Sequence, residues 1–209
     1  MALQRAMFRP FPCTYLQSCG GLGWFPLPAD RQGGGVTATR LLRPDDAPAL
    51  LEIALEDSDF LAPWEPLHDD QWLTEAGQLA VISEKLDQHR LGLALPHVVL
   101  DDGGTVIGRI TLNNVVRGAF QSCSVGYWIR SAANGQGHAT AAVRAMLRVA
   151  FDELGLHRVE AGTLVHNVGS QRVLERNGFV RYGLAPQYVR IAGRWQDHVL
   201  FQVLNPAMP

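Results

Sequence analysis

The sequence predicts an α+β domain with a mixed, mostly antiparallel sheet. The first observation is a pair of strand-like runs joined by the tight turn Asp101–Gly104, which is typical of an antiparallel hairpin. The second is a strongly amphipathic helix at 141–154 that follows a glycine turn and precedes another strand. A strand-turn-helix-strand unit of this kind places its two strands side by side and parallel. The 209 residues suit one domain with a sizeable core.

The first half of the domain is expected to hold two helices among four strands. Asp45 and Asp46 are positioned to cap a helix that carries the apolar residues Leu50 and Ile53. An aromatic, proline-broken loop follows at 60–66, and a second helix is expected at 70–88. The four strands are expected at 36–42, 97–100, 105–112 and 122–129.

The second half continues as helix, strand, helix and three strands. The helix at 141–154 presents one apolar stripe that includes Val143 and Met146, and Gly155 is a suitable C-terminal cap. Asn167 is expected to cap a short helix that Gly178 ends. The strands are expected at 158–165, 179–184, 188–191 and 195–204.

Composition excludes several classes of protein. The formal net charge is −2, from 18 basic and 20 acidic residues, which argues against DNA as a partner. Three cysteines are too few for a disulfide framework or a zinc site, so we expect no metal and a cytoplasmic location. No apolar run reaches the ~18 residues of a membrane span. Residues 1–35 are rich in glycine, proline and aromatics, and we expect a poorly ordered extension before a domain at 36–209.

The run Asn134-Gly135-Gln136-Gly137-His138-Ala139-Thr140 is the strongest candidate for a ligand site. A glycine turn that opens a helix directs backbone N–H groups and the positive end of the helix dipole at an anion such as a pyrophosphate. The two glycines allow close approach, and the Thr140 hydroxyl can add a hydrogen bond. Neither the dinucleotide fingerprint nor the Walker pattern fits, so another phosphate ligand is indicated. The alternative is an ordinary helix N-terminus.

These residues resemble the GCN5-related N-acetyltransferase superfamily. Its signature is Gln or Arg, two residues, Gly, one residue, and Gly or Ala; here Asn134 departs from it, while Gly137 and Ala139 keep it. Asn167, Ser170 and Gly178 resemble a second motif of the family. A closer similarity is to the Rim subfamily, the ribosomal-protein-alanine N-acetyltransferases, over about 37–206. It is carried by segments 60–66, 114–120, 125–127, 157–158, 166–167 and 193–200.

The resemblance implies acetyl-CoA as co-substrate and direct attack of an amine on its thioester. The pyrophosphate would lie on the glycine turn, residues 134–140, and the pantetheine arm between strands 124–130 and 158–165. Asn167 and Ser170 would also contact it. The thioester oxygen gains negative charge, and backbone N–H groups at Trp128 and Ile129 can stabilise it, by about 3 kcal/mol in such sites.

Four residues compete for proton transfer. By analogy with the family, Ser170 would protonate the leaving thiolate; otherwise it is a plain helix-cap residue. The base is Glu65 in the aromatic loop, Glu160 in mid-strand, or His166. Each candidate base also has an alternative without a catalytic role. Glu65 would be a solvated loop glutamate, Glu160 would form an ion pair with Arg158 or a helix arginine, and His166 would be a partly exposed histidine.

Other conspicuous side chains are expected to be structural. Asp197 and His198 match the Rim pattern near the acceptor pocket but fit a last strand equally well. Cys123 has no adjacent histidine to activate it, so burial is expected. The tryptophans at 64, 128 and 195 are expected to line the core or the cleft.

We therefore expect an N-acetyltransferase for the α-amine of a protein N-terminus, with a ribosomal protein as a plausible target. The near-neutral charge agrees, since a polyamine would need an acidic field. The alternatives are an acetyltransferase for a small amine (antibiotic, polyamine or amino acid) and a non-catalytic acyl-CoA sensor. A monomer or homodimer without a membrane partner is expected.

Overall fold

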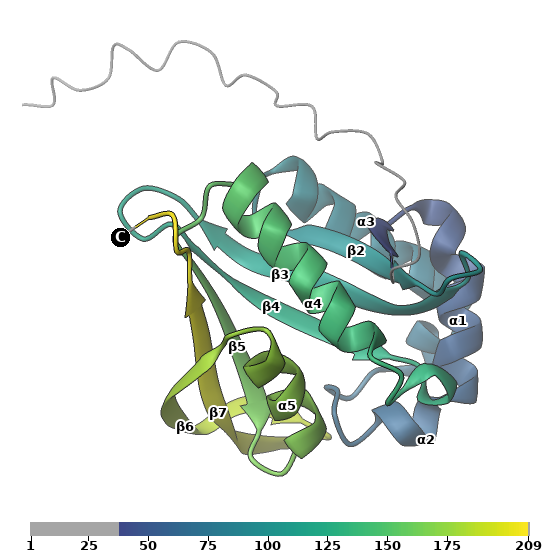
Figure 1. Ribbon diagram of the computed structural model, residues 1–209. Coiled ribbons are helices and arrows are strands. Elements are labelled where there is room, and N and C mark those ends of the chain that lie inside the picture. The colour runs from purple at the N-terminus through teal and green to yellow at the C-terminus, as the bar shows by residue number, and fades with distance from the viewer. Residues whose placement is uncertain (1–37, 209) are drawn as a thin grey trace, which may run out of the picture. The chain divides into compact units, whose positions relative to one another are not determined.

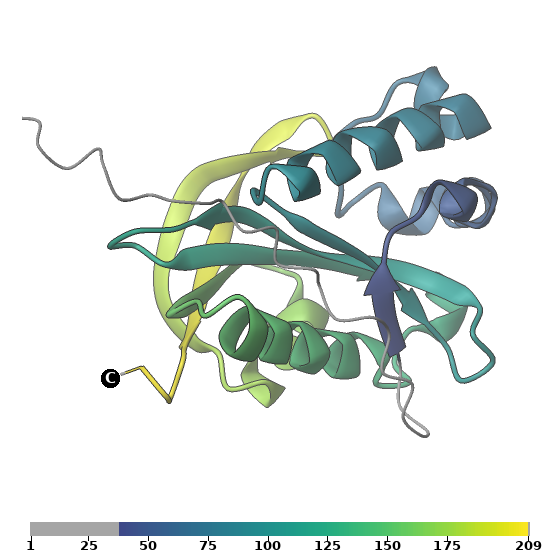
Figure 2. The ribbon, with the colours of Figure 1, turned by 90° about the horizontal axis from the view of Figure 1, so that it is seen from above.

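The computed structural model describes residues 38–208, and the predicted extension at 1–35 lies outside them. Its centre is a seven-stranded sheet in the order β1-β2-β3-β4-β5-β7-β6 (Figure 1). Only the β4–β5 pair is parallel, so the predicted mixed, mostly antiparallel α+β class is confirmed. Figure 2 shows α4 on one side of the sheet and α1 and α3 on the other.

The N-terminal elements are short and broken by turns. In chain order they are β1 (Ala38–Leu41), the 3-10 turn η1 (Pro44–Asp46), α1 (Ala47–Glu56), α2 (Ser58–Leu61), η2 (Asp70–Leu73) and α3 (Glu75–Arg90). The predicted helix at 70–88 is thus two elements, because Asp69 caps the N–H of Trp72 and Thr74 caps that of Gly77. Each cap starts a separate helix.

The prediction that Asp45 and Asp46 cap the first helix holds only in part. No side chain caps the start of α1 itself. The buried Asp46 carboxylate accepts the Arg43 N–H at 2.8 Å, which is a capping-box bond at the start of η1, the turn that leads into α1. The same carboxylate binds the Arg40 guanidinium at 2.6 and 2.8 Å in a charge-assisted bidentate pair.

The middle of the chain forms the predicted meander of β2 (Leu95–Leu100), β3 (Val106–Val116) and β4 (Ser122–Ile129). The β2–β3 turn is closed by Asp101, whose Oδ1 accepts the N–H groups of Gly103 and Thr105 at 2.9 and 2.8 Å. Then come η3 (Ser131–Ala133), α4 (His138–Arg148), the π-helical turn η4 (Val149–Glu153) and β5 (Arg158–Leu164). The predicted parallel β4–β5 neighbours are confirmed.

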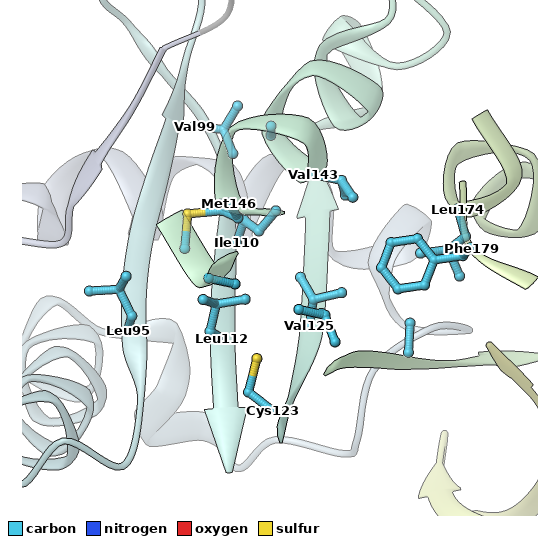
Figure 3. Close-up of a cluster of buried hydrophobic side chains, with 14 of the residues drawn as sticks. Leu95, Val99, Ile110, Leu112, Cys123, Val125, Val143, Met146, Leu174 and Phe179 are labelled. Carbon is cyan, nitrogen blue, oxygen red and sulfur yellow. The ribbon is translucent and has the colours of Figure 1, made fainter. Parts of the chain in front are cut away.

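The apolar stripe of α4 packs on the meander. Figure 3 shows Val143 and Met146 of α4 over Ile110, Leu112 and Val125 of the sheet, and all five are buried. Leu174 and Phe179 join this cluster from the α5 region. A second cluster on the opposite face joins α1 and α3 to the sheet through Leu50, Ile82 and Val98.

The C-terminal part contains α5 (Val168–Arg176), β6 (Val180–Ile191) and β7 (Arg194–Leu204). The two strands expected at 179–184 and 188–191 are one strand. Its register shifts between Ala185 and Val189, and Gln187 there has a φ of 48°. The Asp197 carboxylate accepts the Gln187 N–H at 2.8 Å and bridges the irregularity. Pro186 lies in this irregular stretch, and a proline inside a strand-like run reads as the end of one strand and the start of another.

Phe201 and Leu204, both in β7, provide a matched test of the core. Phe201 is 2% exposed and belongs to the α4 cluster, whereas Leu204 is 45% exposed. We expect Phe201→Ala to lower the free energy of unfolding by about 3–5 kcal/mol, because it leaves a cavity. Leu204→Ala should change it by roughly 0.5 kcal/mol. Urea unfolding measures both; equal losses would contradict the assigned core.

Candidate active site

The parallel strands β4 and β5 separate along their length and leave a gap in the sheet. Their register covers only Ser122–Ser124 against Arg158–Glu160. Beyond Ser124, β4 pairs with β3 on one side, and β5 pairs with β7 on the other. Within the described sheet, the β4 edge at 125–129 therefore has no strand partner.

Neighbouring residues of a strand direct their N–H groups to opposite edges, and Arg130 donates to Ile107 of β3, so the Trp128 backbone faces β3 while those of Tyr127 and Ile129 face the open edge. The backbone groups of Tyr127 and Ile129 are available for a ligand that runs like an extra strand.

The glycine turn lies just beyond the end of β4, at the start of α4. Gly135 and Gly137 have left-handed φ values of 76° and 93°, and no atom lies within 4 Å of a Cβ built on either. The helix begins at His138, three residues before the predicted start, so Ala139 and Thr140 lie in its first turn. The first bonded N–H is that of Ala141, to the Gly137 carbonyl at 3.0 Å. The earlier N–H groups point out of the helix end, as an anion site requires.

The polar side chains of the turn are used to hold its shape. The side-chain Oδ1 of Asn134 accepts the Gly135 N–H at 2.9 Å, and the side-chain amide of Gln136 donates to the Ala132 carbonyl at 2.9 Å. Asn134 stands where the family signature has Gln or Arg, and here its side chain holds the glycine turn through the bond to the Gly135 N–H. The contacts that remain for a ligand are mainly those of the backbone.

The buried Asp57 joins the end of α1 to η3, the turn that precedes the glycine turn. The Asp57 carboxylate, at the end of α1, accepts the Ser131 N–H and the Ser131 hydroxyl, both at 2.6 Å. Beside it, Arg130 pairs with Glu56 at 2.5 Å. Sequence reasoning missed Asp57, because its partner is 74 positions away in the chain.

Ser170 lies against the gap and is bonded to a tyrosine from β4. Its hydroxyl is 2.9 Å from the Tyr127 hydroxyl, which also donates to the Ser170 carbonyl at 3.3 Å. The predicted cap is confirmed: the Asn167 side chain accepts the Ser170 N–H at 3.0 Å. Burial raises the pKa of Tyr127 to about 12, although the Ser170 bond acts in the opposite direction. The phenol thus keeps its proton at neutral pH and can pass it to Ser170.

Glu65 occupies the loop after α2, with only 19% of its side chain exposed. Burial raises the pKa of this carboxyl, while His68, at 3.4 Å, and then Arg109 act to lower it. The His68 ring stacks on Trp72 at 4.0 Å, which fixes its position. The Glu65 carbonyl accepts the Ala192 N–H at 2.9 Å and so ties the loop to the β6–β7 hairpin.

Of the other predicted candidates, His166 lines the groove described below, whereas Glu160 lies in β5. Glu160 is 31% exposed and pairs with Arg158 at 3.5 Å, which is the ion pair expected if Glu160 has no catalytic role. His166 lies beside Trp64, with ring centroids 5.5 Å apart. His198 is buried next to Tyr188, and its Nδ1 is 3.0 Å from the Gln196 carbonyl.

An open groove runs from α2 to the β6–β7 hairpin. It consists of two hollows of about 430 and 390 Å³ that share His166, Arg194 and Gln196. Ala62 and Pro63 line one end, and Trp195 and Asp197 line the other. Its charged lining is one arginine and one aspartate besides the histidine, which suits a neutral, extended ligand.

Three further findings concern the buried cysteine, metal binding and membrane-spanning helices. Burial raises the pKa of the Cys123 thiol to about 12, so this cysteine is inert, as expected. Over residues 38–208 there is no group of three or more His, Cys, Asp or Glu side chains that could hold a metal ion. The same stretch contains no helix long and apolar enough to cross a membrane.

Comparison with known proteins agrees with this geometry. Residues 39–180 match the family described as "Acetyltransferase (GNAT) domain". The chain is 37% identical to the "Probable N-acetyltransferase YjcK" of Bacillus subtilis (strain 168), over 83% of this chain and 96% of that protein. It is 34% identical to the "[Ribosomal protein uS5]-alanine N-acetyltransferase" of Escherichia coli (strain K12), over 80% and 87%.

A solved structure shows the same architecture. It is described as Mycobacterium smegmatis RimJ in complex with CoA-disulfide, has 35% sequence identity, covers 84% of this chain and 85% of that one, and gives a TM-score of 0.79. The expected resemblance is therefore confirmed. The chain is an N-acetyltransferase that belongs to the GNAT family.

Proposed function

We propose that this enzyme transfers the acetyl group of acetyl-CoA to the α-amine of a protein N-terminus, with a ribosomal protein as a natural target. The observation that carries the proposal is the open, nearly neutral groove with one partly buried carboxylate, Glu65, next to it. An extended chain end needs such a groove and a single anion for its ammonium. The similarity to the uS5-alanine acetyltransferase supports the same acceptor.

The residues present fit acetyl-CoA. The free β4 edge at Tyr127 and Ile129 can bind its pantetheine arm and the thioester oxygen, and Asn167 caps the helix whose Ser170 contacts Tyr127 of β4. The two left-handed glycines leave room for a pyrophosphate at the first turn of α4. Acetyl-CoA supplies the activated acyl group.

In this mechanism Glu65 accepts a proton from the ammonium, directly or through water, because only the neutral amine attacks. As the new C–N bond forms and the C–S bond breaks, Ser170 donates a proton to the leaving sulfur, and the attacking nitrogen releases its second proton to solvent. Tyr127 then returns a proton to Ser170 along their 2.9 Å bond and regains its own proton from solvent. We prefer Glu65 to Glu160 as the base, since Glu65 is less exposed and burial raises its pKa.

The second candidate is a small-amine acetyltransferase. The groove lining contains Asp197 as its one carboxylate, and that side chain is bonded to the Gln187 N–H. A polyamine with several cations finds too few anions there. A purely regulatory acyl-CoA sensor is not supported by relatives named as N-acetyltransferases. The cytoplasmic location and the oligomeric state remain predictions from the sequence.

The first prediction concerns the glycine turn. Gly137→Asp should weaken acetyl-CoA binding by tenfold or more, because the carboxylate would lie against the pyrophosphate. Gly118→Asp is the control, since Gly118 also has a positive φ and open space around it but lies in the β3–β4 turn. Calorimetry with acetyl-CoA on both folded variants measures the difference. Similar affinities for the two would sink the assignment.

The second prediction ranks the catalytic candidates. Ser170→Ala and Glu65→Gln should each lower kcat by roughly tenfold or more, with less effect on the KM for acetyl-CoA. Glu160→Gln is the comparison and should have the smaller effect. Because burial raises the pKa of Glu65, wild-type kcat/KM should fall as the pH is lowered through that raised value. The acidic limb should vanish in Glu65→Gln. A silent Glu65→Gln with an impaired Glu160→Gln would move the base to β5.

The third prediction concerns the acceptor. Peptides that begin with Ala or Ser should be acetylated on the α-amine, because one carboxylate and an open groove suffice for a chain end. Mass spectrometry of the products, with spermidine and an aminoglycoside run in parallel, makes the comparison. Faster turnover of either small amine than of every peptide would falsify the protein-substrate proposal.

A further inference from the structure

The hollow of the groove that lies at the α2 end has a positive lining. It is formed by residues after α2, of the β6–β7 hairpin and of the loop after β5, namely Ala62, Pro63, His166, Ala192, Arg194 and Gln196. Arg194 is its charged side chain besides the titratable His166, and no carboxylate of residues 38–208 lines it. The other hollow shares Arg194 but also contains Asp197. The groove is therefore nearly neutral as a whole, whereas its α2 end suits an anion.

Two hydrogen-bond donors of this hollow have no acceptor among the described residues. Arg40 and Arg158 each pair with a carboxylate. Over the same described stretch of the chain, by contrast, the Arg194 guanidinium makes neither a hydrogen bond nor an ion pair within 4 Å. The His166 ring contacts the ring of Trp64, with centroids 5.5 Å apart, but its nitrogens likewise have no bonded partner there. Both side chains are thus available to an oxygen of a ligand.

The neighbouring polar side chains do not neutralise Arg194. The Asp197 carboxylate accepts the Gln187 N–H at 2.8 Å and forms no ion pair with Arg194 within 4 Å. The side-chain amide of Gln196 donates to the Ile191 carbonyl at 3.0 Å. Both side chains stabilise the β6–β7 hairpin, and the positive charge of Arg194 remains for a ligand.

The same hollow adjoins the loop that carries Glu65. The N–H of Ala192, which lines the hollow, donates to the Glu65 carbonyl at 2.9 Å, and Pro63 precedes Glu65 in the loop. A chain end whose ammonium binds Glu65 therefore starts next to this hollow. Because an extended chain advances about 3.3 Å per residue, its second or third residue is the one that meets the hollow.

We propose that this hollow selects acceptors with an acidic side chain at the second or third residue, whose carboxylate binds Arg194. The proposal rests on the proposed function. A planar guanidinium binds a carboxylate through two parallel hydrogen bonds, and the His166 ring can add a third. The backbone of the acceptor carries no charge, which agrees with the nearly neutral groove as a whole. A polyamine has no such carboxylate, and the Arg194 charge repels it.

The experiment compares peptides that differ in the charge of one side chain. All begin with Ala, and one pair carries Asp or its neutral counterpart Asn at position 2, the other pair at position 3. We expect wild type to favour Asp over Asn by about 5- to 15-fold in kcat/KM at one of these positions, between the effect of an exposed ion pair and that of a hydrogen bond to a buried charge. Arg194→Met should remove this preference. It should change kcat/KM for the Asn peptides, and the KM for acetyl-CoA, by less than about twofold.

Two further variants make the test specific to charge and to place. Arg194→Glu reverses the charge, so it should favour a Lys peptide over the Asp peptide. Arg181→Met is the matched control and should keep the wild-type preference, because Arg181 is also an exposed arginine of the β6–β7 hairpin but does not line the groove. Added NaCl should reduce the preference of wild type. An Asp-to-Asn ratio near 1 in wild type at both positions, or a ratio that Arg194→Met leaves unchanged, would overturn the proposal.

Failure of the proposed function would look different. If peptides were acetylated but the Asp and Asn peptides reacted alike, only the Arg194 proposal would fail. If no peptide were a substrate, the protein-substrate proposal would fail, and free aspartate and asparagine would replace the peptides as acceptors. A preference for aspartate that Arg194→Met removes would then support an anion site in the hollow, and no such preference would overturn both proposals.

Discussion

The separation of two parallel strands is the constraint on which the rest of this site depends. β4 and β5 share only three registered pairs, and each then continues with a different antiparallel partner. A buried strand edge without hydrogen-bond partners is unfavourable. Here the side chains of Tyr127 and Ser170 bridge part of the gap. The unpaired edge of β4 is the surface on which we propose that the cofactor binds.

Much of this arrangement could be predicted from the sequence because it depends on local signals. The Asp101 turn, the Asn167 cap and the stripe of Val143 and Met146 are each set by residues within a few positions of one another. Their outcomes were confirmed. The errors came where a side chain has a partner on a neighbouring element. Asp46 binds Arg40 of β1 and does not cap α1, and Asp197 of β7 bridges a bulge in β6 that reads as a break between strands.

The site itself was only partly predictable for the same reason. The glycine turn and Ser170 stand in short motifs, whereas Tyr127 and Asp57 acquire their surroundings from residues 43 to 74 positions away. Tyr127 carries only a weak signal, because its strand also contains Ser122 and Ser124 and a further hydroxyl does not stand out.

The two halves of the site differ in how they are held and in their electrostatics. The assigned cofactor side is built mainly from backbone groups, and its polar side chains, Asn134 and Gln136, bond to the chain itself. On the proposed acceptor side the Glu65 carboxylate lies in a loop next to His68. Asp57 joins the end of α1 to the turn before α4, so a shift of either half would strain the other. A loop that must orient an amine within a few tenths of an ångström needs such an anchor, since small misplacements cost large factors in rate.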